Sequence, residues 1–277
     1  MELYNKTTLE SSKVITQLYS TSFTLGIKTL SKELQSPIYA IYAYVRYADE
    51  IVDTFHTYNK RQLLKEFKEE TYKTIASQIS LNPVLHSFQL IVNQYKIDHA
   101  LIEAFLVSME MDLEQTTYDQ TDYQKYIYGS AEVVGLMCLS VFCNGNKEEY
   151  EDLKPSAQKL GSAFQKINFL RDMSSDFEER GRTYFPTIDF KNVTAKDKLI
   201  IENDIDLDFQ AGLQGIKKLP NGAKLGVYLA YTYYIKLFQK IKTYNFEEIK
   251  SQRIRISDTR KIILLIKSYL KFKFNAI

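Results

Sequence analysis

Apolar residues recur three or four positions apart over long stretches of the chain, which is the spacing of an α-helix. Leu63 with Phe67 and Ile75 with Ile79 are examples, and strand-like alternation is nowhere sustained beyond a few residues. The pattern predicts an all-α protein of about eight to ten helices, which we expect to form a single domain over residues 1–277. The polar stretch from Phe190 to Asp208 is expected to be a surface connection. The predicted breaks between helices lie at Ser36-Pro37, Asn82-Pro83, Asn144 to Asn146, Lys154-Pro155, Phe185-Pro186 and Pro220 to Gly222.

Composition limits the partners and the compartment. Lys and Arg total 36 against 34 Asp and Glu, a net charge of +2, which does not favour a nucleic-acid binder. Cys138 and Cys143 form no disulfide framework or zinc site and suit a reducing cytoplasm. The N-terminus lacks the apolar run of a signal peptide, and the uncharged run 133–146 has 14 residues, too few to span a bilayer. We therefore expect a cytoplasmic protein that is soluble, or peripheral at the inner membrane.

Two acidic segments stand out from this helical background. In the first, Tyr42, Arg46, Asp49 and Asp53 are spaced i, i+4, i+7 and i+11, which places them on one stripe of a helix. Two carboxylates one turn apart repel each other, so burying them together requires a compensating cation.

The second segment repeats this arrangement. Gln165, Asn168, Asp172 and Asp176 are spaced i, i+3, i+7 and i+11, and Arg171 lies beside them. A single pair of aspartates four residues apart is most simply a solvated helix face. Two such pairs, each on an apolar helix and each with an arginine close by, favour a functional site instead.

The chemistry follows from the type of ligand. Carboxylates without His or Cys suit hard cations, above all Mg²⁺, which binds a few protein carboxylates together with phosphate oxygens of a substrate. Two facing aspartate pairs could hold Mg²⁺ ions on a diphosphate and make it a better leaving group. The carbocation left behind needs a dry pocket with aromatic walls. The 21 Tyr and 16 Phe residues could supply such walls, although most aromatic side chains belong to a core.

At this point the motifs resemble those of the squalene/phytoene synthase family, most of all its bacterial phytoene synthases. The resemblance runs from about Ser20 to Lys261, over most of the chain. Its pieces are the segment Ser20 to Phe23, YAIYAYVRYADEIVD (39–53), YIYGSAEVVG (126–135) and QKINFLRDMSSDFEERGRTYFP (165–186).

The resemblance implies an all-α isoprenoid synthase fold around a central cavity, where two prenyl diphosphates condense head to head. It implies that Mg²⁺ or Mn²⁺ and the diphosphates are bound by Asp49, Asp53, Asp172 and Asp176, with Asn168 completing a metal shell. It implies that Arg46 and Arg171 pair with diphosphate oxygens. Further substrate-binding positions implied are Ser20, Ser22 and Phe23 beside the diphosphate, Tyr42, Tyr126 and Gln165 along the cavity, and Tyr234 and Arg253 near the C-terminus.

One position departs from the family pattern. The third motif usually reads Ala-Gly-Val-Val-Gly, and here Glu132 replaces the first glycine. If that position faces the cavity, Glu132 crowds a prenyl chain; if it faces outward, nothing changes.

Within the family, the resemblance favours phytoene synthase, which joins two geranylgeranyl diphosphates and needs no NADPH. Squalene or dehydrosqualene synthase, acting on two farnesyl diphosphates, is the alternative, and reductive squalene synthases commonly carry an apolar C-terminal anchor that this sequence lacks. A non-catalytic relative that acts in binding or assembly is a remote alternative, because such a relative would be expected to lose aspartates from the two pairs. The sequence leaves the oligomeric state open.

The remaining candidates have simpler explanations. His56, His86 and His99 lie far apart, without metal-ligand spacing, and are expected at the surface or its boundary. Both cysteines are expected to be buried thiols. The stretch 262–274 mixes apolar residues with lysines, and either packs on the core or lies on an anionic membrane surface.

Overall fold

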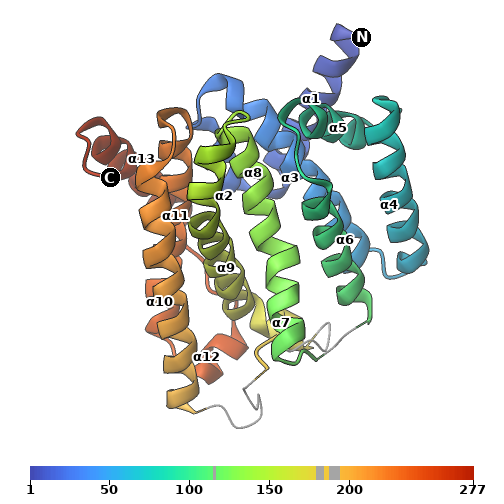
Figure 1. Cartoon of the computed structure of the whole chain (residues 1–277). Helices are drawn as coiled ribbons and strands as arrows, with labels where there is room; N and C mark the ends of the chain where they lie inside the picture. Colours follow the sequence, from blue (N-terminus) through green and yellow to red (C-terminus); the bar gives the residue numbers. More distant parts are fainter. Residues whose placement is uncertain (115–116, 179–183, 187–193) are drawn as a thin grey trace.

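The computed structural model describes residues 1–114, 117–178, 184–186 and 194–277, without the side chains of 174–178. The regular elements of this part of the chain are all helical (Figure 1). They are α1 (Glu2–Tyr19), α2 (Thr21–Lys28), α3 (Lys32–Asp53), α4 (Lys60–Ser77), α5 (Pro83–Tyr95), α6 (His99–Glu114), α7 (Gln120–Ile127), the π-helical segment η1 (Tyr128–Glu132), α8 (Val133–Phe142), α9 (Lys147–Glu178), α10 (Ala195–Lys218), α11 (Asn221–Lys242), α12 (Phe246–Ser251) and α13 (Asp258–Lys273).

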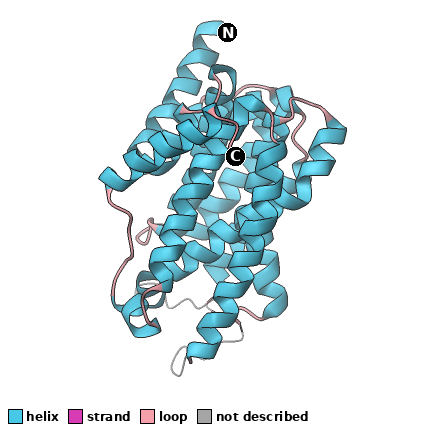
Figure 2. Ribbon diagram, turned by 90° about the vertical axis from the view of Figure 1, so that its left-hand side faces the viewer, coloured by secondary structure: helices cyan, strands magenta, loops and turns pink. Residues whose placement is uncertain are grey.

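The long helices run side by side. Figure 1 and the view turned by 90° in Figure 2 show the bundle with loops gathered at its two ends. Helix α9 packs against both α8 and α10, α3 packs against α8, and α11 packs against α2 and α10. These contacts bring the two acid-bearing helices, α3 and α9, to opposite sides of one space.

Two of the predicted breaks between helices are absent from the structure. Pro37 and Pro155 were expected to mark breaks, but α3 and α9 continue through both. A proline inside a helix costs one backbone hydrogen bond, and the burial of long apolar faces on both helices outweighs that cost here. The short helices α2, α7 and α12 also add to the number expected from the sequence.

The predicted surface connection from Phe190 to Asp208 is wrong from Thr194, the N-cap of α10, onward. Residues 190–193 lie outside the described part of the chain. Helix α10 begins at Ala195, where Thr194 and Asp197 form a reciprocal capping box. Ile201, Ile205 and Phe209 then recur at four-residue spacing and are buried. Asp208 is buried as well, because Lys166 and Ser162 of α9 bind its carboxylate at 2.6 and 2.8 Å. From the sequence, the charge of Asp208 indicated a surface position, because its buried partner Lys166 could not be known.

Helix α3 is buried on more than one face. Tyr44 has no exposed surface and stacks on Phe88 at a ring-centroid distance of 3.8 Å, with Phe67 at 5.2 Å. Ala40 and Ala48 share this face, and their small side chains let the neighbouring helices approach. Aromatic packing of this kind anchors α3 strongly, so that Tyr42 and Arg46 are held in fixed positions on its other face.

Two minor expectations meet different outcomes. His86 is fully buried rather than at the surface, because Asn5 and the backbone N–H of Ser80 satisfy its two ring nitrogens. Cys143 is buried as expected, whereas Cys138 is only half-buried, and burial raises the pKa of its thiol to about 12.

Candidate active site

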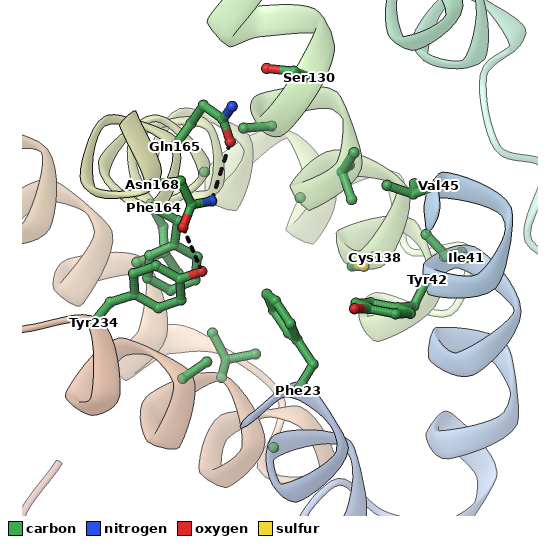
Figure 3. A pocket seen from close by; sticks show the side chains of 18 of the residues that line it. Phe23, Ile41, Tyr42, Val45, Ser130, Cys138, Phe164, Gln165, Asn168 and Tyr234 are labelled. Carbon is green, nitrogen blue, oxygen red and sulfur yellow. Dashed lines mark hydrogen bonds between the residues drawn. The ribbon is translucent and has the colours of Figure 1, made fainter. Parts of the chain in front are cut away.

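A cavity of about 620 Å³ lies at the centre of the bundle. Figure 3 shows α3 on one side and α9 with α11 on the other, with Phe23 of α2 between them. The inner wall is largely apolar, with glycines where helices approach closely. Side chains that form this part include Ile27, Leu30, Ile38, Ile41, Val45, Val134, Leu139, Phe142, Leu153, Leu160, Ile216 and Leu219.

The first predicted stripe lies along this cavity. Tyr42, Arg46, Asp49 and Asp53 all line it, from successive turns of α3. The ring of Tyr42 lies 5.4 Å from that of Phe23, centroid to centroid. The helical spacing read from the sequence therefore places two carboxylates and one guanidinium along the same wall.

Arg46 is held from its outer side. Its guanidinium pairs with Glu50 one turn along α3 and lies 4.6 Å above the ring of Tyr19. Its Nε is buried and has no hydrogen-bond partner among the described residues. A buried donor without an acceptor is costly, and an anion in the cavity could supply the acceptor.

The electrostatics on the α3 side favour a bound cation. Burial raises the pKa of the Asp49 carboxyl to about 8, against the opposing effect of Arg46. The negative charges of Asp53 and Asp112 add to the rise. A carboxylate in this environment gains stability when a positive charge is bound beside it.

The second stripe forms the facing wall. Gln165, Asn168 and Asp172 line the cavity from α9. The hydroxyl of Tyr234 donates to Asn168 Oδ1 at 3.2 Å, and Asn168 Nδ2 donates to Gln165 Oε1 at 3.4 Å (Figure 3). Tyr234 is itself fixed by stacking on Phe164 at 4.0 Å. This chain of hydrogen bonds holds both amide side chains at the cavity surface.

Asp172 lies between two arginines. The Nε of Arg171 donates to its two oxygens at 3.0 and 3.1 Å, and the Nε of Arg253 lies 2.7 Å from Oδ1. The cluster joins α9 to the segment that follows α12, and all three side chains line the cavity. Asp176 belongs to α9, but its side chain lies outside the described residues.

The predicted α2 residues lie beside these walls. Ser20 is the N-cap of α2, where its Oγ accepts from the backbone N–H of Phe23 at 3.2 Å. Ser20 and Phe23 line the main cavity, and Ser22 lines a smaller pocket next to it. Tyr126 reaches the main cavity from α7. The structure thus gathers the predicted positions around one space, with Ser22 at its side and Asp176 not described.

Comparison with known proteins places this arrangement in a family. A family model described as squalene/phytoene synthase matches residues 16–260. The chain belongs to the squalene/phytoene synthase family. The family membership predicted from the four motifs is therefore confirmed.

Relatives in this family include phytoene synthases. The chain is 24% identical over 271 residues to chloroplastic phytoene synthase 1 of Solanum lycopersicum, covering 91% of this chain and 65% of that protein. It is 29% identical over 203 residues to phytoene synthase of Arthrospira platensis, covering 69% of this chain and 65% of that protein. The chain therefore spans slightly less than two thirds of the length of these relatives.

Solved structures support the same fold. A dehydrosqualene synthase crystallised with a ligand superposes with a TM-score of 0.81 at 20% identity, covering 97% of this chain and 98% of the other. Squalene synthase HpnC from Alicyclobacillus acidocaldarius gives 0.76 at 18% identity, covering 87% and 95%. The predicted all-α isoprenoid synthase fold is confirmed.

One carboxylate that lines the cavity was missed from the sequence. Asp112 of α6 lines the cavity, and its Oδ2 accepts from the Tyr126 hydroxyl at 2.7 Å. The hydroxyls of Tyr118 and Tyr184 lie 3.4 and 3.3 Å from its other oxygen. Asp112 stands between Met111 and Leu113 with Glu110 and Glu114 close by, so the sequence did not set it apart from its neighbours. Of its tyrosine partners, Tyr118 is 6 residues away, whereas Tyr126 and Tyr184 are 14 and 72 residues away.

The Tyr126–Asp112 bond should contribute measurably to stability. Tyr126→Phe should lower the free energy of unfolding by about 1.5 to 3 kcal/mol, the usual value for a hydrogen bond to a charged group. Tyr123→Phe is the matched control, because Tyr123 belongs to the same helix and its hydroxyl makes no described hydrogen bond. Urea denaturation measures both variants, and equal losses would show that the Asp112 bond adds nothing.

The unusual Glu132 faces away from the cavity. Its carboxylate accepts from Gln158 Nε2 of α9 at 3.0 Å. The cavity wall in this region comes from its neighbours Ser130, Ala131 and Val134. Glu132 was expected either to face the cavity and crowd a prenyl chain or to face outward without effect. The structure shows that it faces outward.

Glu132→Gly, which restores the usual motif, should leave turnover within about twofold of the wild type. The chain length of the product should not change. It should cost about 1 to 2 kcal/mol of stability through a lost hydrogen bond and a more flexible backbone. Glu132→Ala separates the two causes, since only the hydrogen bond is lost. Product analysis beside thermal unfolding measures both effects, and a changed product length would return Glu132 to the cavity wall.

The residues present fit divalent metal ions together with a substrate anion. Oxygen donors of Asp49, Asp53, Asn168 and Asp172 line the cavity, which is the donor set that Mg²⁺ prefers. Arg46 Nε and Ser130 Oγ are buried in the same lining without a hydrogen-bond partner in the described part of the chain. Within the described residues, no three His, Cys, Asp or Glu side chains gather closely enough to hold a metal by themselves. The oxygen donors that line the cavity thus fit a divalent cation bound together with phosphate oxygens of a substrate.

Proposed function

We propose that this chain is a phytoene synthase, which condenses two geranylgeranyl diphosphates head to head through a cyclopropylcarbinyl diphosphate. The observation that carries the proposal is one apolar cavity with an acid-bearing helix on each of two facing walls. One such wall suits one diphosphate, and two suit a reaction that joins two prenyl diphosphates. The phytoene synthases among its relatives support the choice of product.

The diphosphate groups would bind between α3 and α9. Asp49, Asp53, Asp172, Asp176 and Asn168 would hold Mg²⁺ or Mn²⁺, which when bound neutralises the departing pyrophosphate. Arg46 would turn its free Nε to a phosphate oxygen. Arg171 and Arg253, which bind Asp172 in this structure, would exchange that carboxylate for phosphate oxygens.

The carbocation would be protected by the aromatic walls. Phe23 with Tyr42, and Phe164 with Tyr234, form two ring pairs at the cavity surface. Aromatic faces attract a cation, and the attraction is stronger where water is excluded. The final cation can lose a proton, so the proposed reaction needs no NADPH.

The prenyl chains would occupy the apolar end of the cavity. Helices α10 and α11 approach it with Gly212, Gly215 and Gly226. A Cβ on Gly226 would lie 2.4 Å from Leu30 Cδ2 and 2.8 Å from the carbonyl oxygen of Gly26. Substitution there would push α11 away from α2, so the glycine sets how closely this wall packs.

The test of the proposed function is product analysis with each substrate separately. The full chain is incubated with Mg²⁺ and either geranylgeranyl or farnesyl diphosphate, with and without NADPH, and hydrocarbons are identified by mass spectrometry. We expect phytoene from the C20 substrate in both conditions. A chain that forms no C40 product would belong to the C15 branch if it makes squalene only with NADPH, or dehydrosqualene without it. No product in any arm would favour a non-catalytic relative.

Cavity size should control the choice between C15 and C20 substrates. Cys138 lines the cavity on α8, one turn from Val134 and from Phe142 (Figure 3). Cys138→Phe should raise the ratio of kcat/KM for farnesyl over geranylgeranyl diphosphate by about 10- to 100-fold, because each excluded methylene forfeits about 0.8 kcal/mol. Cys138→Ser keeps the size and is the control, and an unchanged ratio in Cys138→Phe would show that the longer chain does not pass this point.

A further inference from the structure

Helix α13 presents an exposed apolar face at the edge of the molecule. It lies at the periphery of the bundle in Figure 1 and packs against α11. Leu264 and Ser268 are its buried residues. The six large apolar side chains that are between 45% and 72% exposed are Ile262, Ile263, Ile266, Tyr269, Leu270 and, at the C-cap, Phe274.

These six side chains share one face of the helix. At 100° per residue they span an arc of about 140°, opposite Leu264 and Ser268. The apolar arc of a helix normally points into a core. On α13 the arc points outward instead, while the opposite face, with Leu264, packs on the protein. An exposed patch of this kind is typical of an interaction surface.

The charges around the arc are almost all positive. Arg260, Lys261, Lys267, Lys271 and Lys273 belong to α13, against Asp258 as its acidic residue. Lys267 lies at the edge of the arc, and Lys273 projects from within it near the C-terminal end. Asp258 is bound to Lys261 at 3.0 Å on the first turn, away from both lysines.

The helix also lies beside the active-site cavity. A small pocket of about 90 Å³ is formed by α2, α11 and α13, with Lys261 and Leu264 on the α13 side. It shares Ser20, Phe23, Arg171, Ala230 and Tyr234 with the main cavity. A surface on which α13 rests would therefore lie next to this wall of the reaction site.

We propose that α13 docks the protein on an anionic lipid bilayer, with its apolar face in the interface and its lysines at the lipid phosphates. An exposed apolar arc edged by lysines is the pattern of a helix that lies in the membrane plane. A contact between two copies through this face would instead bring two sets of lysines into one interface, so like charges would repel. Among the described helices none is long and apolar enough to cross a membrane, so the contact is one of surface docking.

Sedimentation with vesicles tests this proposal on the full chain without any prenyl substrate. Vesicles of phosphatidylglycerol and phosphatidylcholine in equal parts should bind the protein at low salt, and pure phosphatidylcholine should bind it much less. Ile266→Asp should weaken binding at least about 10-fold. Replacing Lys267 and Lys273 together by Gln should weaken it by roughly 30-fold, about fivefold for each lysine.

Leu81→Asp is the matched control, because Leu81 is 93% exposed between α4 and α5, on the side of the molecule away from α13 (Figure 1). This variant should bind like the wild type, and thermal unfolding should show all variants folded. Equal binding by Ile266→Asp, or no binding to anionic vesicles, would overturn the proposal. A wild-type dimer in light scattering that Ile266→Asp dissociates would assign the face to a second copy and overturn it as well. Because no substrate is present, these outcomes do not depend on the proposed reaction.

Discussion

Asp49→Asn and Asp172→Asn should each lower turnover by at least about 100-fold, the usual scale for losing one preorganised charge-stabilising group. The two residues lie on facing walls of the cavity, on α3 and α9. Each change keeps the size of the side chain and removes the charge that would hold a metal ion on one diphosphate. Steady-state kinetics with Mg²⁺ in excess measures the loss.

The same two variants should change stability in opposite directions. Asp49 carries a carboxyl whose pKa is raised by burial to about 8, so Asp49→Asn should stabilise the metal-free protein at pH 8. Since one pKa unit corresponds to about 1.4 kcal/mol, and water in the cavity reduces the effect, we expect a gain of about 1 to 3 kcal/mol. Because the raised pKa makes the wild type lose stability as pH rises from about 4 to 8, the advantage of Asn should grow over that window.

Asp172→Asn should instead cost about 1 to 2 kcal/mol, because Arg171 and Arg253 lose a charged partner. Asp152→Asn is the matched control on the same helix, since its ion pair with Lys218 is exposed and should contribute little. Its turnover should stay within about twofold of the wild type. Stability changes of the same sign in Asp49→Asn and Asp172→Asn would contradict the charge distribution described for the two walls.

Removal of divalent metal should abolish turnover altogether. The oxygen donors lining the cavity belong to side chains on opposite walls, so a bound ion needs phosphate oxygens to complete its coordination. Excess EDTA should stop the reaction, and Mg²⁺ or Mn²⁺ added beyond the chelator should restore it. Far-UV circular dichroism in EDTA is the control and should stay unchanged. Full activity in EDTA would rule out the metal-assisted departure of pyrophosphate.

The two stripes could be read from the sequence because helical periodicity alone decides which side chains share a face. Tyr42, Arg46 and Asp49 are positioned by one continuous helix, so their relation needs no knowledge of the tertiary fold. The same holds for Gln165, Asn168 and Asp172 on α9. What periodicity could not supply was that α3 and α9 face each other across the cavity.

Several of the features that were missed depend on contacts between distant segments. Asp112 became part of the site through Tyr126 and Tyr184, 14 and 72 residues away. The burial of Asp208 could not be read from the sequence, because its partner Lys166 belongs to α9; the helix around it did have local signals, the capping box of Thr194 and Asp197. Glu132 could not be oriented without its partner Gln158, 26 residues further on. Pairings across the bundle decided where the side chains of Asp112, Asp208 and Glu132 lie.

The central claim is that two prenyl diphosphates lose their pyrophosphates in this cavity and are joined. Its most direct measurement is the ratio of pyrophosphate released to C40 hydrocarbon formed, with geranylgeranyl diphosphate and Mg²⁺ as the additions. Joining two substrates breaks two carbon–oxygen bonds and releases two protons, so we predict two pyrophosphates for each phytoene. Asp172→Asn should form both products at least about 100-fold more slowly. Pyrophosphate released without any C40 hydrocarbon, or no release at all by the wild-type protein, would contradict the account.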